Sequence, residues 1–190
     1  DAAPEPGPSA AEARSAEAVA RFEAPLVRYV TRLLGDPEEA RDVVQETFLK
    51  LVRAPAADTE GRMAEWLYTV ARNRAVDVKR KRRRVEGLAP ERAAAAPDPA
   101  RSPAEAAEMR DEASVAAAAL AALPENQQEA LRLKLQHGLA YKEIASVMGV
   151  SATYVGWLLH VGLKAIRGRM QERERDGARG HGRGVPGDER

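Results

Sequence analysis

A basic segment in the first half of the chain has the residue types that bind nucleic acid. Eight basic residues and one acid fall between Trp66 and Arg84, although the whole chain carries a net charge of only +1. Lysine and arginine neutralise phosphates, and an amide such as that of Asn73 can pair with a base edge. The six consecutive cations from Lys79 to Arg84 repel one another and persist best beside a polyanion. The segment predicts a nucleic-acid surface rather than a merely solvated helix end.

Two aromatic residues, Trp66 and Tyr68, precede the basic run. Aromatic rings beside a cationic groove can stack on unpaired bases, as in proteins that bind single strands. A core position is the favoured explanation for Trp66, although the spacing leaves both interpretations open.

A helix-turn-helix pattern extends from Tyr141 to Leu158. Such a unit crosses two helices over a short turn, and Ala145 supplies the small residue where they touch. Gly149 supplies the residue that tolerates positive φ in the turn, and Ser151 is placed to cap the second helix. The expected buried positions are Ile144, Met148, Val150, Val155 and Leu158. A plain pair of packed helices is the alternative, but it seldom combines all these features.

An acidic helix is expected before the basic segment. Asp36 is an N-cap candidate followed by Pro37 at the first helical position, and five acids but only one arginine lie between Asp36 and Glu46. Acids at the start of a helix also favour its dipole. The polar side is either a solvated face or a surface for a partner, and it carries Glu39, Asp42, Gln45 and Glu46.

The elements that must position these residues are all helices. Apolar residues recur at helical spacing, and strand-like alternation appears nowhere. We expect an all-α fold of two small helical domains joined by a flexible linker, the second with the helix-turn-helix. The domains are residues 18–84 and 104–175, with a proline- and glycine-containing linker over 85–103 and disordered tails over 1–17 and 176–190. The expected inward side of the second helix includes Val52, and a loop is expected over 54–62.

Several classes of function are disfavoured by composition. The chain has no cysteine, and its three histidines lack metal-ligand spacing. No nucleophile–base set or phosphate-binding glycine loop is apparent, so we expect no enzyme, no cofactor and no metal. Neither an apolar run of about 20 residues nor a signal-peptide core is apparent, which favours a cytoplasmic protein.

The two motif sets resemble the sigma-70 family, specifically its small extracytoplasmic-function (ECF) members that contain only regions 2 and 4. Asp42–Leu51 is similar to region 2.2, and Trp66–Asp77 is similar to regions 2.3 and 2.4. Leu123-Pro124, Tyr141–Ala145 and the following helix are similar to region 4. The motifs are independent and lie in the family's order, so the resemblance is specific.

This resemblance implies a sigma factor that binds core RNA polymerase, directs it to promoters and helps to melt the −10 element. It implies polymerase contacts through the β′ clamp and the β flap, promoter DNA as a second partner, and an anti-sigma factor as a further candidate partner. The implied contacts with the β′ clamp are Glu39, Asp42, Gln45, Glu46 and Lys50. The implied contacts with −10 DNA are Trp66, Tyr68, Arg72, Asn73, Asp77, Arg80, Arg82 and Arg83. The implied contacts with −35 DNA are Lys142, Ser151, Thr153, Tyr154, Trp157, His160 and Lys164.

The last helix departs from the family pattern. Positions that usually hold cations have Gly156, Leu158, Val161 and Leu163. The expected buried stripe is Val155, Leu159, Gly162 and Ile166, and the expected outer face is Thr153, Trp157, His160, Lys164 and Arg167. The outer face either reads −35 DNA with few cations or packs on protein. A free-standing helix-turn-helix regulator and a protein-interaction module that uses this helix remain alternatives to a sigma factor.

Overall fold

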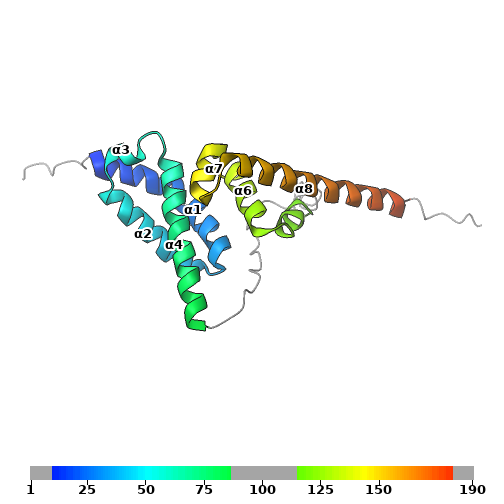
Figure 1. The fold of residues 1–190 in the computed structure, drawn as a ribbon, viewed down its shortest axis with the longest axis horizontal. Coiled ribbons are helices and arrows are strands. Elements are labelled where there is room, and N and C mark those ends of the chain that lie inside the picture. The colour runs from blue at the N-terminus through cyan, green and yellow to red at the C-terminus, as the bar shows by residue number, and fades with distance from the viewer. Residues whose placement is uncertain (1–9, 87–114, 182–190) are drawn as a thin grey trace, which may run out of the picture.

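The computed structural model describes residues 10–86 and 115–181, and every regular element among them is a helix (Figure 1). This confirms the expected all-α class with two helical domains. The first domain contains α1 (Ala10–Leu34), α2 (Pro37–Arg53), α3 (Ala56–Thr59) and α4 (Met63–Glu86). The second contains a helical segment over 115–121, then α6 (Glu125–Leu135), α7 (Tyr141–Met148) and α8 (Ala152–His181).

The first domain is a three-helix core with α3 as a short connector. Helices α1, α2 and α4 pack against one another in all three pairings. Leu26, Leu51 and Leu67 contribute one leucine from each helix and are all fully buried. The sharp step from α1 to α2 is fixed by Asp36, whose side chain accepts hydrogen bonds from the backbone N–H groups of Glu38 and Glu39 at 2.8 and 3.2 Å. The predicted N-cap is therefore confirmed.

The second domain has the predicted helix-turn-helix geometry. Gly149 has φ +67°, and the Val150 N–H donates back to the Ala145 carbonyl, which ends α7. Ser151 accepts a hydrogen bond from the Tyr154 N–H at 3.1 Å and so caps α8 as predicted. Ile144, Met148, Val155 and Leu158 are buried, and Val150 is partly buried against the same core.

Close contact between α6 and α8 accounts for one of the unusual glycines in the last helix. A Cβ atom added at Gly162 would lie 2.8 Å from Leu131 Cδ1 and 3.5 Å from Leu123 Cδ1. Leu131 is itself buried in the core, so it has little room to move. A glycine at this position therefore lets α8 lie directly on α6, and Gly162 belongs to the buried stripe, as predicted.

Several boundaries differ from those expected. Helix α1 begins at Ala10, inside the expected N-terminal tail, because the Arg14 guanidinium donates to the Ala54 carbonyl at 3.1 Å and Ala18 is buried. The expected loop over 54–62 contains α3, and α8 continues six residues beyond Arg175. Val52 does not face the core: it is 54% exposed, because its neighbour Leu51 occupies the inward position. Expectations for 1–9, 87–114 and 182–190 lie outside the described residues.

No single helix among the described residues is both long enough and apolar enough to cross a membrane. The helices Tyr141–Met148 and Ala152–Arg173 reach that length and apolar composition only when taken together, and they meet at a bend of 102°.

Candidate nucleic-acid interface

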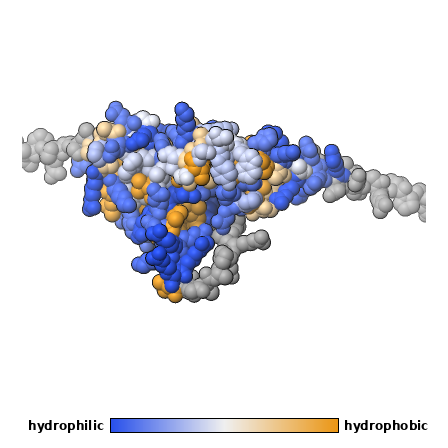
Figure 2. All heavy atoms as spheres, in the orientation of Figure 1, coloured by the Kyte–Doolittle hydropathy of each residue, from blue (hydrophilic) through white to orange (hydrophobic). Residues whose placement is uncertain are grey.

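The exposed side of α4 carries polar residues from the predicted nucleic-acid motif. Asn73, Asp77, Arg80 and Arg83 are exposed, and the Arg80 guanidinium donates to Asp77 at 3.0 Å. In Figure 2 the lower part of α4 is a mostly hydrophilic projection with a hydrophobic patch at its tip. The surface combines cations that can contact phosphates with an amide that can discriminate bases.

Arg82 differs from its neighbours in the basic run because it faces the domain's own core. Its guanidinium donates to the Leu34 carbonyl at 3.1 Å and to the Glu39 carboxylate at 3.4 Å. The first contact places a cation at the C-terminal end of α1, where the helix dipole favours it. Arg82 therefore ties α4 to α1 and α2, whereas Arg83 and Arg84 are exposed.

The acidic helix is partly engaged with α4. Arg74 donates to both carboxylate oxygens of Glu46, at 2.5 and 3.0 Å. This hydrogen bond and the charge of Arg74 lower the pKa of Glu46. Because both side chains are more than a third exposed, we expect the pair to contribute at most about 1 kcal/mol to stability. Its main effect is to orient α2 against α4.

The remaining α2 residues of the predicted polymerase-docking set face outward. Asp42, Gln45 and Lys50 are exposed. Asp42 also borders an open groove of about 470 Å³ between α2 and α4. The structure thus separates the set into Glu39 and Glu46, which hold α4, and three residues available to another molecule.

Three residues at the start of the −10 motif lie inward. Trp66 is partly buried against the core, and Tyr68 is only 1% exposed. The Arg72 side chain is 23% exposed because it contacts the second domain. In this arrangement neither Tyr68 nor Arg72 presents a free face to a nucleic acid.

Five residues form the centre of the contact between the two domains, and we call them the domain seam: Tyr29, Tyr68, Arg72, Glu129 and His137. Two further pairs, Arg32 with Gln136 and Lys79 with Glu125, also join the domains. The Glu129 carboxylate accepts two hydrogen bonds from Arg72, at 2.7 and 3.3 Å, and one from the Tyr29 hydroxyl at 2.7 Å. The Tyr68 hydroxyl lies 2.7 Å from His137 Nδ1. Tyr29, Tyr68 and His137 also contact one another through their rings, and α4 packs on α7 beside them (Figure 1).

Burial and nearby charges shift the pKa values of three seam residues. Burial lowers the pKa of His137 to about 4, and the nearby cations Arg28 and Arg32 reinforce the shift. Burial opposes the charge of Arg72, but the hydrogen bond and charge of Glu129 outweigh it and raise the pKa of Arg72. Burial, with a smaller effect of Glu129, raises the pKa of Tyr29 well above its usual value. At neutral pH the seam therefore holds a charged Arg72 and a neutral His137.

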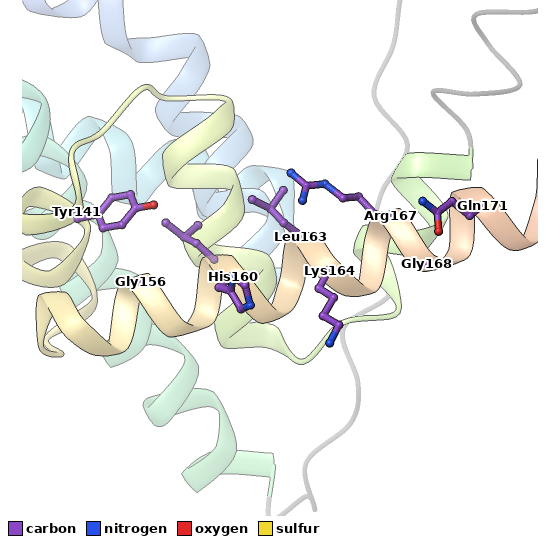
Figure 3. A pocket seen from close by; sticks show the side chains of 9 residues that line it. Tyr141, Gly156, His160, Leu163, Lys164, Arg167, Gly168 and Gln171 are labelled. Atoms are coloured by element: carbon purple, nitrogen blue, oxygen red, sulfur yellow. The ribbon is translucent and has the colours of Figure 1, made fainter.

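The helix-turn-helix presents an aromatic rather than a cationic outer face. Tyr154 stacks on Trp157, with ring centroids 5.6 Å apart, and Trp157 is 51% exposed. An open groove of about 670 Å³ runs along α8 beside them, with Tyr141 at one end and Arg167 toward the other (Figure 3). All members of the predicted −35 set are exposed: Lys142, Ser151, Thr153, Tyr154, Trp157, His160 and Lys164.

The seam residues Tyr29, Glu129 and His137 were not among the sequence-predicted site residues. Their contacts join positions 57 to 100 residues apart along the chain, so no local spacing could have indicated them. Among the described residues, no group of three histidine, aspartate or glutamate side chains is placed to hold a metal ion.

Comparison with known families identifies both domains. The family profile described as sigma-70 region 2 matches residues 18–85, and that described as sigma-70 region 4 matches residues 115–166. The first match contains α2 and α4 with the basic run, and the second contains the helix-turn-helix. Two helical domains that carry these motifs define a sigma-type transcription protein.

Two of the curated relatives share most of their length with this chain. The ECF RNA polymerase sigma factor SigL of Mycobacterium tuberculosis is 32% identical over 169 residues, which cover 87% of this chain and 94% of SigL. The RNA polymerase sigma factor CarQ of Myxococcus xanthus is 30% identical and covers 82% of this chain and 89% of CarQ. The chain belongs to the sigma-70 family, in its ECF group.

Solved structures support the fold. The sigma factor RpoE of Bartonella quintana, in complex with the anti-sigma factor NepR, superposes with a TM-score of 0.61 at 21% identity. That alignment covers 82% of this chain and 96% of RpoE. CnrH, in complex with the cytosolic domain of CnrY, superposes with a TM-score of 0.52 at 20% identity over 83% of this chain and 88% of CnrH. Similar helices in similar order therefore occur in both proteins.

Proposed function

We infer that this chain is a sigma factor that binds core RNA polymerase, directs it to specific promoters and helps to melt the −10 element. One observation carries this inference: region 2 and region 4 are both present, in the family's order, on one chain that aligns along 94% of a curated ECF sigma factor. A free-standing helix-turn-helix regulator would account for the second domain alone. It would leave the first domain without a role.

The exposed residues of α2 are the proposed contact with the β′ clamp. Asp42, Gln45 and Lys50 face outward, while Glu46 is held by Arg74. Because Asp42 carries its charge at the surface, reversing it should weaken docking without breaking the contact between α2 and α4. We expect Asp42→Lys to reduce co-elution with core polymerase in gel filtration. Glu23→Lys, an equal charge reversal on the exposed side of α1, is the matched control.

Retention of Asp42→Lys on core at the wild-type level would remove this edge of α2 from the interface. A loss of binding shared equally by Glu23→Lys would show only a general effect of net charge. The helical content of each variant, followed by circular dichroism, separates lost docking from lost folding.

The exposed polar edge of α4 is the proposed contact with the −10 element. Asn73 can discriminate bases, whereas Arg80, Arg83 and Arg84 can grip phosphates without reading sequence. Asn73→Ala should therefore change melting or base preference more than the salt dependence of binding. Permanganate footprinting of the open complex measures the melting. A wild-type footprint and base preference in Asn73→Ala would exclude Asn73 from the site.

The exposed aromatic face of α8 is the proposed contact with −35 DNA, with the β flap as the protein contact of the same domain. Each good bidentate base contact gives about 1–3 kcal/mol of discrimination. The outer face holds few side chains able to make one, so we expect modest selectivity for −35 sequences. The alternative occupant of this face is a protein. Loss of selectivity for a −35 duplex over a scrambled duplex in Trp157→Ala would favour DNA, and unchanged selectivity would favour protein.

We expect further properties from the family. Two structural neighbours are recorded in complexes, one with an anti-sigma factor, and an anti-sigma factor is accordingly a candidate partner of this chain. We expect a cytoplasmic location, where polymerase and promoter DNA are found. We expect no catalytic activity of the chain's own, since a sigma factor acts by binding.

A further inference from the structure

We propose that two stacked aromatic residues of α8, Tyr154 and Trp157, read the −35 element through the methyl groups of its thymines. We call this pair the aromatic plate. The proposal rests on the proposed binding of −35 DNA by α8, and it names the feature of the DNA that is recognised. Thymine carries an apolar methyl group in the major groove, so the plate can distinguish bases without the cations that usually read them.

The aromatic plate lies at the end of α8 that a helix-turn-helix places in the major groove. In such units the N-terminal residues of the second helix contact base edges. Helix α8 begins at Ala152, so Tyr154 and Trp157 belong to its first two turns. Val155 and Leu158 are fully buried and hold this part of α8 on the core, whereas Tyr154 and Trp157 are exposed. The plate therefore faces away from its own domain.

Contacts within the second domain hold the plate in place. The rings of Tyr154 and Trp157 are nearly parallel, with an interplanar angle of 11°. The Tyr154 hydroxyl accepts a hydrogen bond from the Asn126 amide at 3.0 Å, and the Tyr154 N–H donates to the Ser151 hydroxyl at 3.1 Å. The hydroxyl of Tyr154 thus has a partner within the protein, and the rings remain for a ligand. An apolar surface that is ordered before binding loses little conformational entropy when it binds.

The first turns of α8 lack the side chains that read bases through paired hydrogen bonds. Those side chains are arginine, lysine, asparagine and glutamine, and none of them occurs from Ala152 to His160. Thr153 is exposed beside the plate and adds a methyl group of its own. In the major groove, the thymine methyl is the apolar group that sets A·T pairs apart from G·C pairs. Thr153 and the plate match that methyl group better than they match any donor or acceptor of a base.

The charges around the plate favour DNA over protein as its occupant. Between Ala152 and Gln171 the chain has three cations and no acid. Lys164 and Arg167 follow Trp157 at helical spacing, and they line the open groove of α8 together with His160 (Figure 3). Cations beside a base-reading surface contact phosphates, which carry no sequence information. This side of α8 therefore combines an apolar reader with cations suited to the DNA backbone.

Replacement of thymine by deoxyuridine tests the plate, because it removes the methyl group and keeps every hydrogen-bonding group of the base. Holoenzyme formed from core polymerase and the full-length chain would first select −35 sequences from duplexes randomised upstream of the −10 element. The most frequent selected duplex would then be made with deoxyuridine at each thymine of the −35 element, on either strand, one at a time. The same replacement in the spacer between the two elements is the matched control.

We expect deoxyuridine to weaken binding of the holoenzyme about fourfold at each contacted thymine, as for the loss of one buried methyl group, with no change in the spacer. Trp157→Ala should bind the thymine and deoxyuridine duplexes equally, because the ring that contacts the methyl group is absent. Trp157→Phe keeps an apolar ring and should retain part of the preference. Lys164→Gln should lower the log–log salt slope by about 0.9 and keep the preference for thymine.

Equal affinity of the wild-type holoenzyme for thymine and deoxyuridine at every −35 position would overturn the proposal, as would selected −35 elements without an A·T pair. A thymine preference that survives unchanged in Trp157→Ala, with helical content preserved, would overturn it too. Any of these results, joined to weaker binding of core polymerase by Trp157→Ala, would assign the plate to a protein partner and leave the proposed function standing. A wild-type chain that gives no promoter binding with core polymerase would overturn the proposed function and the plate together.

Discussion

Protonation of His137 should open the domain seam as the pH falls. Its pKa is about 4 in the closed chain, since the ring is buried near Arg28 and Arg32 with Tyr29 and Tyr68 against it. In an open chain the ring is hydrated, and its pKa returns toward about 6.5. The open state therefore binds more protons between these two values. The stability of the closed state is complete above about pH 6.5 and decreases as the pH falls toward 4.

The two pKa values determine the size of the effect. Over the full range, the shift of the His137 pKa from about 6.5 to about 4 corresponds to about 3 kcal/mol in the stability of the closed state relative to the open state. Between pH 7.5 and pH 5 the closed state should lose about 2 kcal/mol relative to the open state, which is about a thirtyfold change in their ratio. Carboxylates elsewhere begin to titrate below pH 5, so the range from 7.5 to 5 isolates the histidine best.

Energy transfer between dyes at Ala20→Cys and Ser146→Cys, recorded across this pH range, measures the effect. Wild type should lose transfer on acidification, and His137→Gln should lose most of that pH dependence. His160→Gln is the control, because His160 is exposed on α8. The reasoning fails if the profile of His137→Gln matches that of wild type. It fails equally if His160→Gln abolishes the dependence.

Three other predictions concern packing and charge. In urea denaturation, the free energy of unfolding of Gly162→Ala should be about 1–3 kcal/mol lower than that of Gly156→Ala. The Cβ added at position 162 would lie 2.8 Å from Leu131, whereas the Cβ added at position 156 would meet only Tyr141, at 3.8 Å. Equal unfolding midpoints would contradict the close packing of α6 and α8. Gly156→Ala itself should stabilise α8 by up to about 1 kcal/mol, and a lower midpoint than wild type would refute this. Replacing both Arg83 and Arg84 with alanine should reduce the log–log salt slope of promoter binding by about 0.7–0.9 per residue. Arg82→Ala should mainly lower the stability of the fold, because Arg82 contacts Leu34 and Glu39. A salt slope that changes in Arg82→Ala but not in the double variant would reverse these roles.

Local signals in the sequence were sufficient for the helix ends and the helix-turn-helix. Asp36, Gly149 and Ser151 each act on backbone atoms within a few residues, so their roles follow from residue type and position alone. Helical spacing also predicted the buried side of α7 and the exposed face of α8. The boundary at Ala10 was missed because a tertiary contact, from Arg14 to Ala54, extends α1 beyond its apolar pattern.

The domain seam could not be predicted, because its contacts depend on how two separate motifs meet in space. Tyr68 and Arg72 have the composition of a nucleic-acid surface in the sequence, and only the structure shows them against His137 and Glu129. Within the basic run, spacing alone could not distinguish Arg82, which holds α1 and α2, from its exposed neighbour Arg83. The sequence therefore predicted which polar residues belong to the sites, but it did not predict which residues of the same chain they contact.

Run-off transcription tests the central claim most directly. Purified core polymerase would be incubated with a library of promoter fragments, with and without the full-length chain. A sigma factor predicts transcripts that start at defined positions on a subset of promoters and appear only when the chain is present. A chain that leaves the products of core polymerase unchanged on every fragment, while still binding duplex DNA by itself, would contradict the account and favour a free-standing regulator.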